Sequence, residues 1–336
     1  MNEWGRVKRV LIGTATRAKL PRVNEHTRYV YYADRDADSV LPQGNYSQTI
    51  IDEANEDLDT LANIYKDFGA EVERPNMSWS SDRHHALYCP RDTILTVADQ
   101  IITAPMCVNT RKDEWVNMLS PGNLGGNFPD HELAGAHLFD DSDYNPECVQ
   151  NKKILALDNH KPMWDAANVL RAGHDMLYLE SNTGNLRGAK QLQDILGNDY
   201  KVHVLQDVYS YSHIDSTICL LRPGLALINP ARIKSKDDLP YAMQNWDILT
   251  CPEPVEKSWT DHCMSSTWTN MNLVSLDERT VVVDSIQTPT IQMLEAHGFT
   301  VIPINMRHQR TLDGGPHCCT VELDREYDLE TYFDKT

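Results

Sequence analysis

Residues 216–229, STICLLRPGLALIN, place two apolar runs on either side of an Arg-Pro-Gly turn. Short apolar runs bounded by turn residues predict strands, so this segment is expected to form a β-hairpin. Residues 237–246, DDLPYAMQNW, are then expected to form a helix, and residues 247–252, DILTCP, a further strand. The stretch therefore predicts a ββαβ unit.

The same order of elements recurs along the chain. A hairpin is expected at 169–180, with a helix at 185–196 and a strand at 200–205, and another at 271–284, with a helix at 288–298 and a strand at 299–304. A fourth hairpin is expected at 93–104, and a split unit joins strands 320–324 and 7–13 to a helix at 49–69 and a strand at 70–75. One such unit cannot bury its apolar face alone, so five units closed by the two chain ends predict an α/β propeller or array.

Composition narrows the function. The 336 residues carry a formal net charge of −18, which disfavours binding to nucleic acid or to an anionic membrane and suits an enzyme acting on small cationic molecules. No apolar run reaches the roughly 18 residues of a membrane helix, and the N-terminus lacks a signal-peptide pattern, so a cytoplasmic location is expected. The eight scattered cysteines are expected to be free thiols, and residues 1–336 to form one catalytic domain.

A short polar motif precedes each predicted hairpin. Equivalent positions in a pseudo-symmetric ring point to one axis, so these side chains are expected to meet in one central pocket. The motifs supply Asp92, Asp165, His213 with Asp215, Ser265 with Ser266, and His317 with Cys318.

These residue types fit one chemistry. Inward carboxylates suit a planar guanidinium with several N–H donors, and such a cation favours the thiolate of a nearby cysteine. Cys318 follows a Gly-Gly pair at a loop-to-strand junction, which favours an exposed nucleophile. A histidine beside a carboxylate can shuttle protons. The pocket therefore predicts covalent catalysis on a guanidino compound.

The segments CPRDTI, WDAANVLRAGHD, HIDSTICLLRPGLALINPAR, MSSTW and GGPHCCT resemble, in this order, the arginine:glycine amidinotransferases and their guanidino-modifying relatives. The resemblance implies a five-bladed pseudo-symmetric α/β propeller, a homodimer, no cofactor and no metal. It implies ping-pong transfer of the amidino group of L-arginine to an acceptor amine through an amidino-cysteine, with release of ornithine. It implies Cys318 as nucleophile, His213 as acid/base, Asp165 as its orienting carboxylate, Asp92 and Asp215 as guanidinium ligands, Arg232 as ligand of the donor carboxylate, and Ser265 and Ser266 as further donor contacts.

The chain departs from the family pattern on the acceptor side. Asn168 stands where glycine-using relatives usually have a second aspartate, and Ser212 stands where a methionine-like residue is usual. Pro316 and Cys319 replace bulky neighbours of the nucleophile. A smaller residue at 212 leaves more room, so the acceptor is glycine or a larger amine.

Other interpretations stay open. The scaffold suits an arginine hydrolase, with water as acceptor, or a non-catalytic guanidino-binding protein. Asp165 can be a helix cap, Asp92 can pair with Arg91, and Arg232 can be a solvated charge. Cys319 is expected to point away from Cys318 by strand alternation and to be structural. His131 and His137 are six residues apart, which does not fit a zinc site on one helical face.

Overall fold

The structure, a computed structural model, describes residues 1–33, 35–36, 38–77, 86–119, 139–256, 263–328 and 330–333, and the backbone of 130–133. The fold class is α/β, as predicted. The described helices are α1 (Glu25–Val30), α2 (Gln48–Phe68), α3 (Trp115–Met118), α4 (Leu186–Leu196) and α5 (Thr288–Ala296). None of them is long and apolar enough to cross a membrane.

Five three-stranded sheets with one common pattern dominate the described part of the chain. In each, the middle strand pairs antiparallel with one neighbour and parallel with the other. The sheets are β17 (Thr320–Arg325), β1 (Val7–Ile12), β4 (Glu71–Glu73); β5 (Ile94–Val97), β6 (Gln100–Thr103), β7 (Asp130–Leu133); β8 (Val169–Ala172), β9 (Asp175–Leu179), β10 (Lys201–Leu205); β11 (Ile218–Arg222), β12 (Leu225–Ile228), β13 (Asp247–Thr250); and β14 (Val274–Ser275), β15 (Thr280–Asp284), β16 (Thr300–Ile304). Strands β2 (Lys19–Leu20) and β3 (Gly44–Asn45) form a separate pair.

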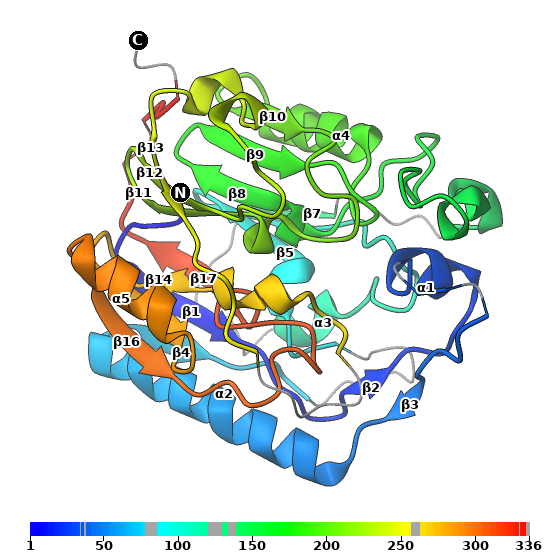
Figure 1. The fold of residues 1–336 in the computed structure, drawn as a ribbon, viewed down its shortest axis with the longest axis horizontal. Coiled ribbons are helices and arrows are strands. Elements are labelled where there is room, and N and C mark those ends of the chain that lie inside the picture. The colour runs from blue at the N-terminus through cyan, green and yellow to red at the C-terminus, as the bar shows by residue number, and fades with distance from the viewer. Residues whose placement is uncertain are drawn as a thin grey trace.

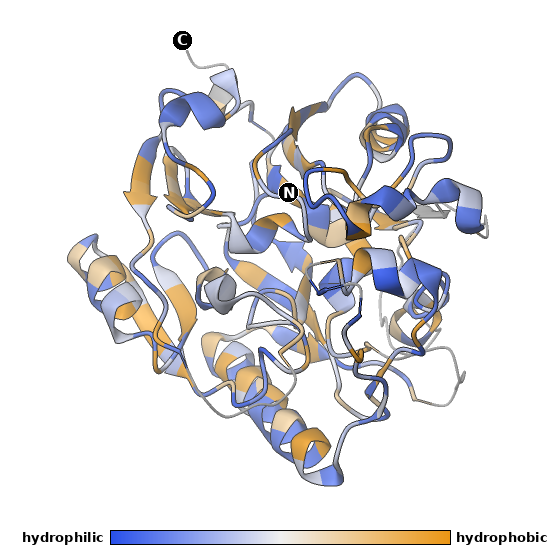
Figure 2. Cartoon of the chain, turned by 45° about the vertical axis from the view of Figure 1, so that its right-hand side comes forward, coloured by the Kyte–Doolittle hydropathy of each residue, from blue (hydrophilic) through white to orange (hydrophobic). Residues whose placement is uncertain are grey.

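The split unit is confirmed. Strand β1 pairs with β17 from Val7 opposite Arg325 to Ile12 opposite Thr320, so the two ends of the chain share one sheet. Helix α2 leads into β4, as predicted, after β2, α1 and β3 have followed β1. It buries Ala54, Leu58, Leu61 and Tyr65 along one side, a spacing that gives the helix one apolar stripe. Figure 2 shows this stripe, and Figure 1 shows α2, α4 and α5 at separate outer edges of the molecule.

One predicted helix is wrong. Residues 237–246 form two short 3₁₀ turns, η6 (Lys236–Asp238) and η7 (Tyr241–Met243), instead of an α-helix. Pro240 explains the break, because it has no N–H and disfavours helical geometry in the residue before it. Leu239 is indeed extended, with φ −93° and ψ 153°.

The polar motifs precede their hairpins as 3₁₀ turns. These are η1 (Pro90–Asp92) before β5, η4 (Ala166–Asn168) before β8, η5 (Ile214–Ser216) before β11 and η8 (Thr267–Met271) before β14. The turns touch in sequence: η1 contacts η4, η4 contacts η5, and η5 contacts η8. The structure therefore brings together segments that are up to about 180 residues apart in the chain.

Candidate active site

Cys318 lies in the turn that leads into β17 and is buried, so the prediction of an exposed thiol was wrong. Groups from two other units hold it. The Asn272 side chain accepts from the Cys318 backbone N–H at 2.9 Å, and its Nδ2 donates to Sγ at 3.0 Å. The thiol in turn donates to Asp215 Oδ2 at 3.1 Å. Asp215 follows the cap of η5, so a thiol and a carboxylate that are far apart in sequence are in contact, as predicted.

His213 lies between two carboxylates. Its Nε2 is 3.1 Å from Asp165 Oδ2, and its Nδ1 is 3.5 Å from Asp92 Oδ1. The other oxygen of Asp165 accepts from the Cys107 backbone N–H at 3.0 Å. Asp165 stands at the N-cap of η4 but makes no side-chain capping bond, so the capping interpretation is not the one the geometry favours.

Asp92 has a partner that the sequence did not predict. Arg111 Nη1 donates to Asp92 Oδ2 at 2.7 Å and its Nε donates to Glu114 at 2.8 Å. Arg91, the expected partner, instead pairs with Glu322 at 2.7 Å. Asp92 Oδ1 is buried and lacks a hydrogen-bond partner within the described residues. This oxygen lies 3.5 Å from His213 Nδ1 and accepts no hydrogen bond there, so it can still receive a further N–H donor.

Their surroundings raise the pKa values of both the Cys318 thiol and the His213 imidazole. The hydrogen bond with Cys89, burial and the Asp215 carboxylate together raise the pKa of Cys318 well above its usual value, although His213 opposes this. Burial disfavours the charged form of His213, but Asp92 and Asp165 outweigh it and raise the pKa of His213. These shifts favour a thiol beside an imidazolium, and a cation between the carboxylates would shift the sulfur towards thiolate.

Arg232 and Ser266 form a second group. Arg232 Nη1 donates to Ser216 Oγ at 2.8 Å and to Thr217 Oγ1 at 2.7 Å, while its Nη2 donates to Ser266 Oγ at 3.2 Å. The guanidinium lies 3.3 Å from the centre of the Tyr209 ring. Arg232 is half-buried and fixed, not a freely solvated charge. Among the described residues, the Ser265 hydroxyl makes only long hydrogen bonds, to the Arg310 carbonyl at 3.4 Å and the Gln309 carbonyl at 3.5 Å.

Gly314 and Gly315 let the backbone before Cys318 pack closely against neighbouring residues. A Cβ on Gly314 would lie 2.5 Å from Cys89 Sγ and 2.6 Å from Cys318 Cβ, and one on Gly315 would lie 3.0 Å from Asn272. The left-handed backbone conformation falls instead on Asp313, with φ 63°. Cys319 is buried among apolar side chains, but it lies in the turn before β17. The strand-alternation argument for its direction was therefore wrong, because the strand begins only at Thr320.

A network of buried ion pairs lies next to the site and contacts it through His317. Glu322 pairs with Arg91 and Arg171, each at 2.7 Å, and with Arg325 at 3.2 Å. Glu3 pairs with Arg171 at 2.7 Å. His317 lies 3.4 Å from Glu3 and 3.0 Å from Asp215, so it links this network to the carboxylate that touches the nucleophile. The sequence signal for it was charged residues inside apolar strands, as in VLRA and TVEL.

Asn168 does not share in this site. Its side chain donates to the Leu179 carbonyl at 2.7 Å and to Ser181 Oγ at 2.9 Å, and it accepts from Thr183 Oγ1 at 2.8 Å. All of these bonds hold the turn after β9. Of the two spaced histidines, His131 lies on strand β7, which is not a helix, and His137 lies outside the described residues. Within the described residues, no three His, Cys, Asp or Glu side chains are placed to hold a metal ion.

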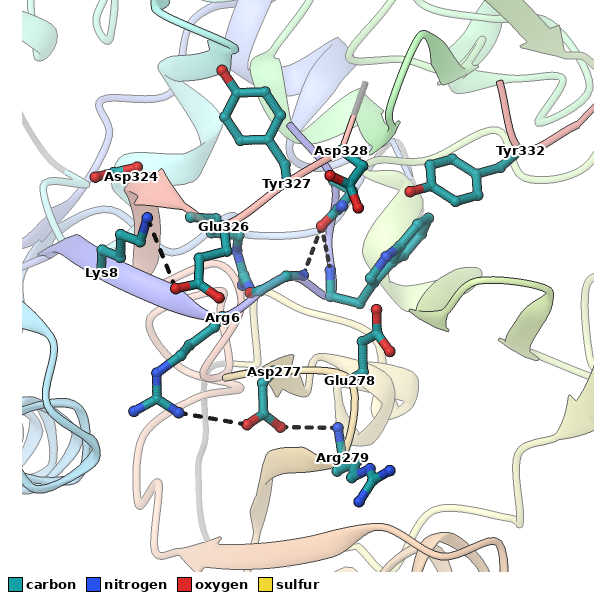
Figure 3. A pocket seen from close by; sticks show the side chains of 14 residues that line it. Arg6, Lys8, Asp277, Glu278, Arg279, Asp324, Glu326, Tyr327, Asp328 and Tyr332 are labelled. Atoms are coloured by element: carbon teal, nitrogen blue, oxygen red, sulfur yellow. Dashed lines mark hydrogen bonds and ion pairs between the residues drawn. The ribbon is translucent and has the colours of Figure 1, made fainter. Parts of the chain in front are cut away.

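A second, larger cleft lies where the two chain ends meet. Its lining in Figure 3 includes Arg6, Lys8, Asp277 and Glu326, and no cysteine or histidine is among the lining residues described. The charges pair loosely with one another: Arg6 lies 3.9 Å from Asp277 and Lys8 lies 3.9 Å from Glu326. Without a nucleophile or an acid/base pair, this cleft is not the catalytic pocket.

The chain resembles known amidinotransferases along almost its whole length. Inosamine-phosphate amidinotransferase 1 of Streptomyces glaucescens is 38% identical, over 98% of this chain and 97% of that protein. L-arginine:L-lysine amidinotransferase of Pseudomonas savastanoi pv. phaseolicola is 31% identical, over 98% and 95%. Among solved structures, inosamine-phosphate amidinotransferase StrB1 of Streptomyces griseus matches with a TM-score of 0.89 and 36% identity, over 99% and 98%. A scan against family models found no match.

Hydrolases are more distant. DDAH from Pseudomonas aeruginosa shares 16% identity at a TM-score of 0.60, over 94% of this chain and 99% of that one, which indicates a common fold alone. A buried thiol close to a histidine that lies between two carboxylates, on an α/β fold, is a site typical of an enzyme. The identity to the bacterial relatives takes the assignment further: the chain belongs to the amidinotransferase family.

Proposed function

We propose that this enzyme moves the amidino group of L-arginine to an acceptor amine, glycine or a larger amine, through an amidino-thioether on Cys318. The observation that carries the proposal is the contact of Cys318 with Asp215 at 3.1 Å, beside a His213 held by Asp165 at 3.1 Å. The names of relatives that act on inosamine phosphate or lysine support transfer to an amine. The enzyme works on small molecules, in the cytoplasm.

In the first half-reaction, the charged side chains of the site bind arginine and Cys318 takes its amidino group. The guanidinium of arginine binds between Asp215 and Oδ1 of Asp92, which accepts no hydrogen bond within the described residues, and Arg232 with Ser265 and Ser266 receives the amino-acid end. The added positive charge lowers the pKa of Cys318, whose proton leaves to solvent. The thiolate attacks the guanidinium carbon and forms the C–S bond. The His213 imidazolium protonates the departing nitrogen, the C–N bond breaks, and ornithine leaves.

The acceptor half reverses these steps. An amine attacks the amidino carbon, neutral His213 takes a proton from the nitrogen that has attacked, and the C–S bond breaks to return the thiolate. We also propose that residues 1–336 form one domain in which the five sheets are the blades of a propeller. The common strand pattern of the sheets and the pairing of β1 with β17 support this arrangement.

One experiment tests the proposal. The enzyme is incubated with arginine, with and without a panel of amines, and products and intact protein are analysed by mass spectrometry. Ornithine with a guanidinylated amine, and an amidino adduct on Cys318, are expected. Citrulline, or ornithine with urea in place of transfer, would favour the hydrolase. No turnover and no adduct would favour a binding protein, and activity retained in Cys318→Ala would contradict the nucleophile.

A further inference from the structure

The proposed reaction leaves one proton without an acceptor. An alkylamine reaches the enzyme as an ammonium at neutral pH, because its pKa is about 10. It must lose one proton to expose the lone pair that attacks, and a second one after the new C–N bond forms. His213 has given a single proton to the departing ornithine, so it can take back only one. A second base is therefore required, and this inference rests on the proposed function.

The pocket beside the nucleophile holds a carboxylate with no assigned role. Asp313 lines this pocket together with Cys89, Asp92, Arg111 and Met264. It lies one residue before Gly314, whose Cα is packed against Cys318. Asp92 is already paired with Arg111, and Asp215 and Asp165 hold Cys318 and His213. For the half-buried Asp313 carboxylate, no hydrogen bond or ion pair with a described side chain is recorded.

The backbone conformation of Asp313 supports a functional role for its carboxylate. Asp313 has φ 63°, a left-handed conformation that is unfavourable for most L-residues and that glycine adopts freely. Two glycines follow immediately, yet the strained position carries a carboxylate. Outliers of this kind cluster at functional sites.

We propose that Asp313 binds the ammonium of the acceptor and takes the first of its two protons. The carboxylate accepts a proton from R–NH₃⁺ and leaves R–NH₂ in the pocket. The nitrogen lone pair then attacks the amidino carbon on Cys318, His213 takes the second proton, and the C–S bond breaks with its electrons returning to sulfur. Asp313 releases its proton to solvent before the next cycle.

The electrostatic surroundings suit a base that works near neutral pH. Burial and the carboxylates of Asp92 and Asp215 raise the pKa of Asp313 to about 7, against the opposing effect of His213 and Arg111. A base with a pKa near the working pH is the most effective. The titratable and charged groups that interact with Asp313 or line its pocket are His213, Asp92, Arg111, Asp215, Tyr31, Tyr32, Tyr46, Tyr88, Cys89 and Lys19.

Two acceptors of different basicity test the proposal. Labelled ornithine, which must lose two protons, reports its own conversion to arginine in an exchange reaction with unlabelled arginine. Hydroxylamine, which is mostly unprotonated at neutral pH, needs to lose only one. Asp313→Asn is expected to slow ornithine exchange about 100-fold at pH 7 and to change hydroxylamine turnover by no more than about twofold. The loss with ornithine is expected to shrink as the pH approaches the pKa of the amine, about 10.

Two further variants separate chemistry from folding. Asp313→Gly relieves the left-handed conformation, so its thermal stability is expected to equal or exceed that of the wild type while its exchange falls as in Asp313→Asn. Asp207→Asn is the matched control, because Asp207 is exposed and has nearly the same φ, 59°. Equal losses with both acceptors at every pH, or no loss with either, would overturn the role of Asp313. A wild-type enzyme that neither exchanges ornithine nor forms the adduct would overturn the transferase proposal and this inference with it.

Discussion

Asn272 holds Cys318 at two points, through the backbone N–H at 2.9 Å and through Sγ at 3.0 Å. One amide therefore fixes the backbone of the nucleophile and gives a hydrogen bond to its sulfur. A thiolate accepts such a bond more strongly than a thiol, so Asn272 favours the reactive form.

Replacing this amide tests the relationship. Asn272→Ala is expected to lower kcat about 10–100-fold, because the sulfur loses its donor and the turn loses its tether. Asn272→Asp keeps an acceptor for the backbone N–H but places a second carboxylate against the sulfur, so its loss is expected to be greater. Steady-state ornithine release measures both, with circular dichroism as the control for folding. An aspartate variant as active as wild type would contradict the role.

The sequence predicted the site better than it predicted what surrounds the site. The hairpins and their polar motifs repeat, so the meeting of Asp92, Asp165, His213, Asp215 and Cys318 follows from equivalent places in one pattern. Arg111 follows no such pattern. It lies in a segment between β6 and α3, and only the folded chain brings its guanidinium to Asp92.

Local structure explains why two arguments from the sequence failed. The helix expected at 237–246 was wrong because Pro240 interrupts it and leaves Leu239 extended. Strand alternation does not apply to Cys318 and Cys319, because both lie in the turn before β17, which begins at Thr320; the direction of Cys319 therefore stays a prediction. Asn272 could not be predicted at all, since an asparagine at the start of a hairpin is typical of turns as well as of sites.

Asp215 should have opposite effects on thiol reactivity and on turnover. Its negative charge contributes to the raised pKa of Cys318, yet it also serves to bind the donor guanidinium. Asp215→Asn is therefore expected to speed alkylation of Cys318 by iodoacetamide at pH 8, about tenfold for each unit by which the pKa falls. The same variant is expected to lose about 100-fold or more in arginine turnover.

Peptide mapping assigns the alkylation to Cys318 and separates it from the seven other cysteines. Because the pKa of Cys318 is raised, wild-type alkylation is expected to keep increasing above pH 9. Slower alkylation in Asp215→Asn, or unchanged turnover, would show that this carboxylate does not control the thiol as described.

Arg232 should determine the preference for a donor that carries a carboxylate. Its guanidinium is fixed by Ser216, Thr217 and Ser266 and by the ring of Tyr209, which leaves a directed positive charge at the edge of the site. Arg232→Ala is expected to lower kcat/KM for arginine about 10–100-fold and to leave agmatine, which lacks the carboxylate, little changed. Arg232→Lys should recover only part of the loss, because lysine cannot form the paired bonds. Equal losses on arginine and agmatine would instead point to a structural role.

Glu322 should govern stability in a pH-dependent way. Burial alone would raise the pKa of this carboxylate, but Arg91, Arg325 and Arg171 hold the pKa of Glu322 well below its usual value. A depressed pKa in the folded state contributes stability above the unfolded pKa, about 4.3, and loses it as the pH falls further. Glu322→Gln is expected to cost about 3–5 kcal/mol at pH 7, because three buried arginines lose one partner.

The pH dependence of unfolding tests whether the effect of Glu322→Gln comes from the lost charge. Thermal unfolding of wild type and Glu322→Gln is compared from pH 7 down to pH 4, and the gap between them is expected to narrow below about pH 5, since only the wild type loses the contribution of this carboxylate. Glu326→Gln is the matched variant: its side chain is 59% exposed and its ion pair with Lys8 is 3.9 Å long, so it is expected to change stability by less than about 0.5 kcal/mol. A gap that stays constant with pH would mean that Glu322→Gln acts through packing, not through the charge that holds the three arginines.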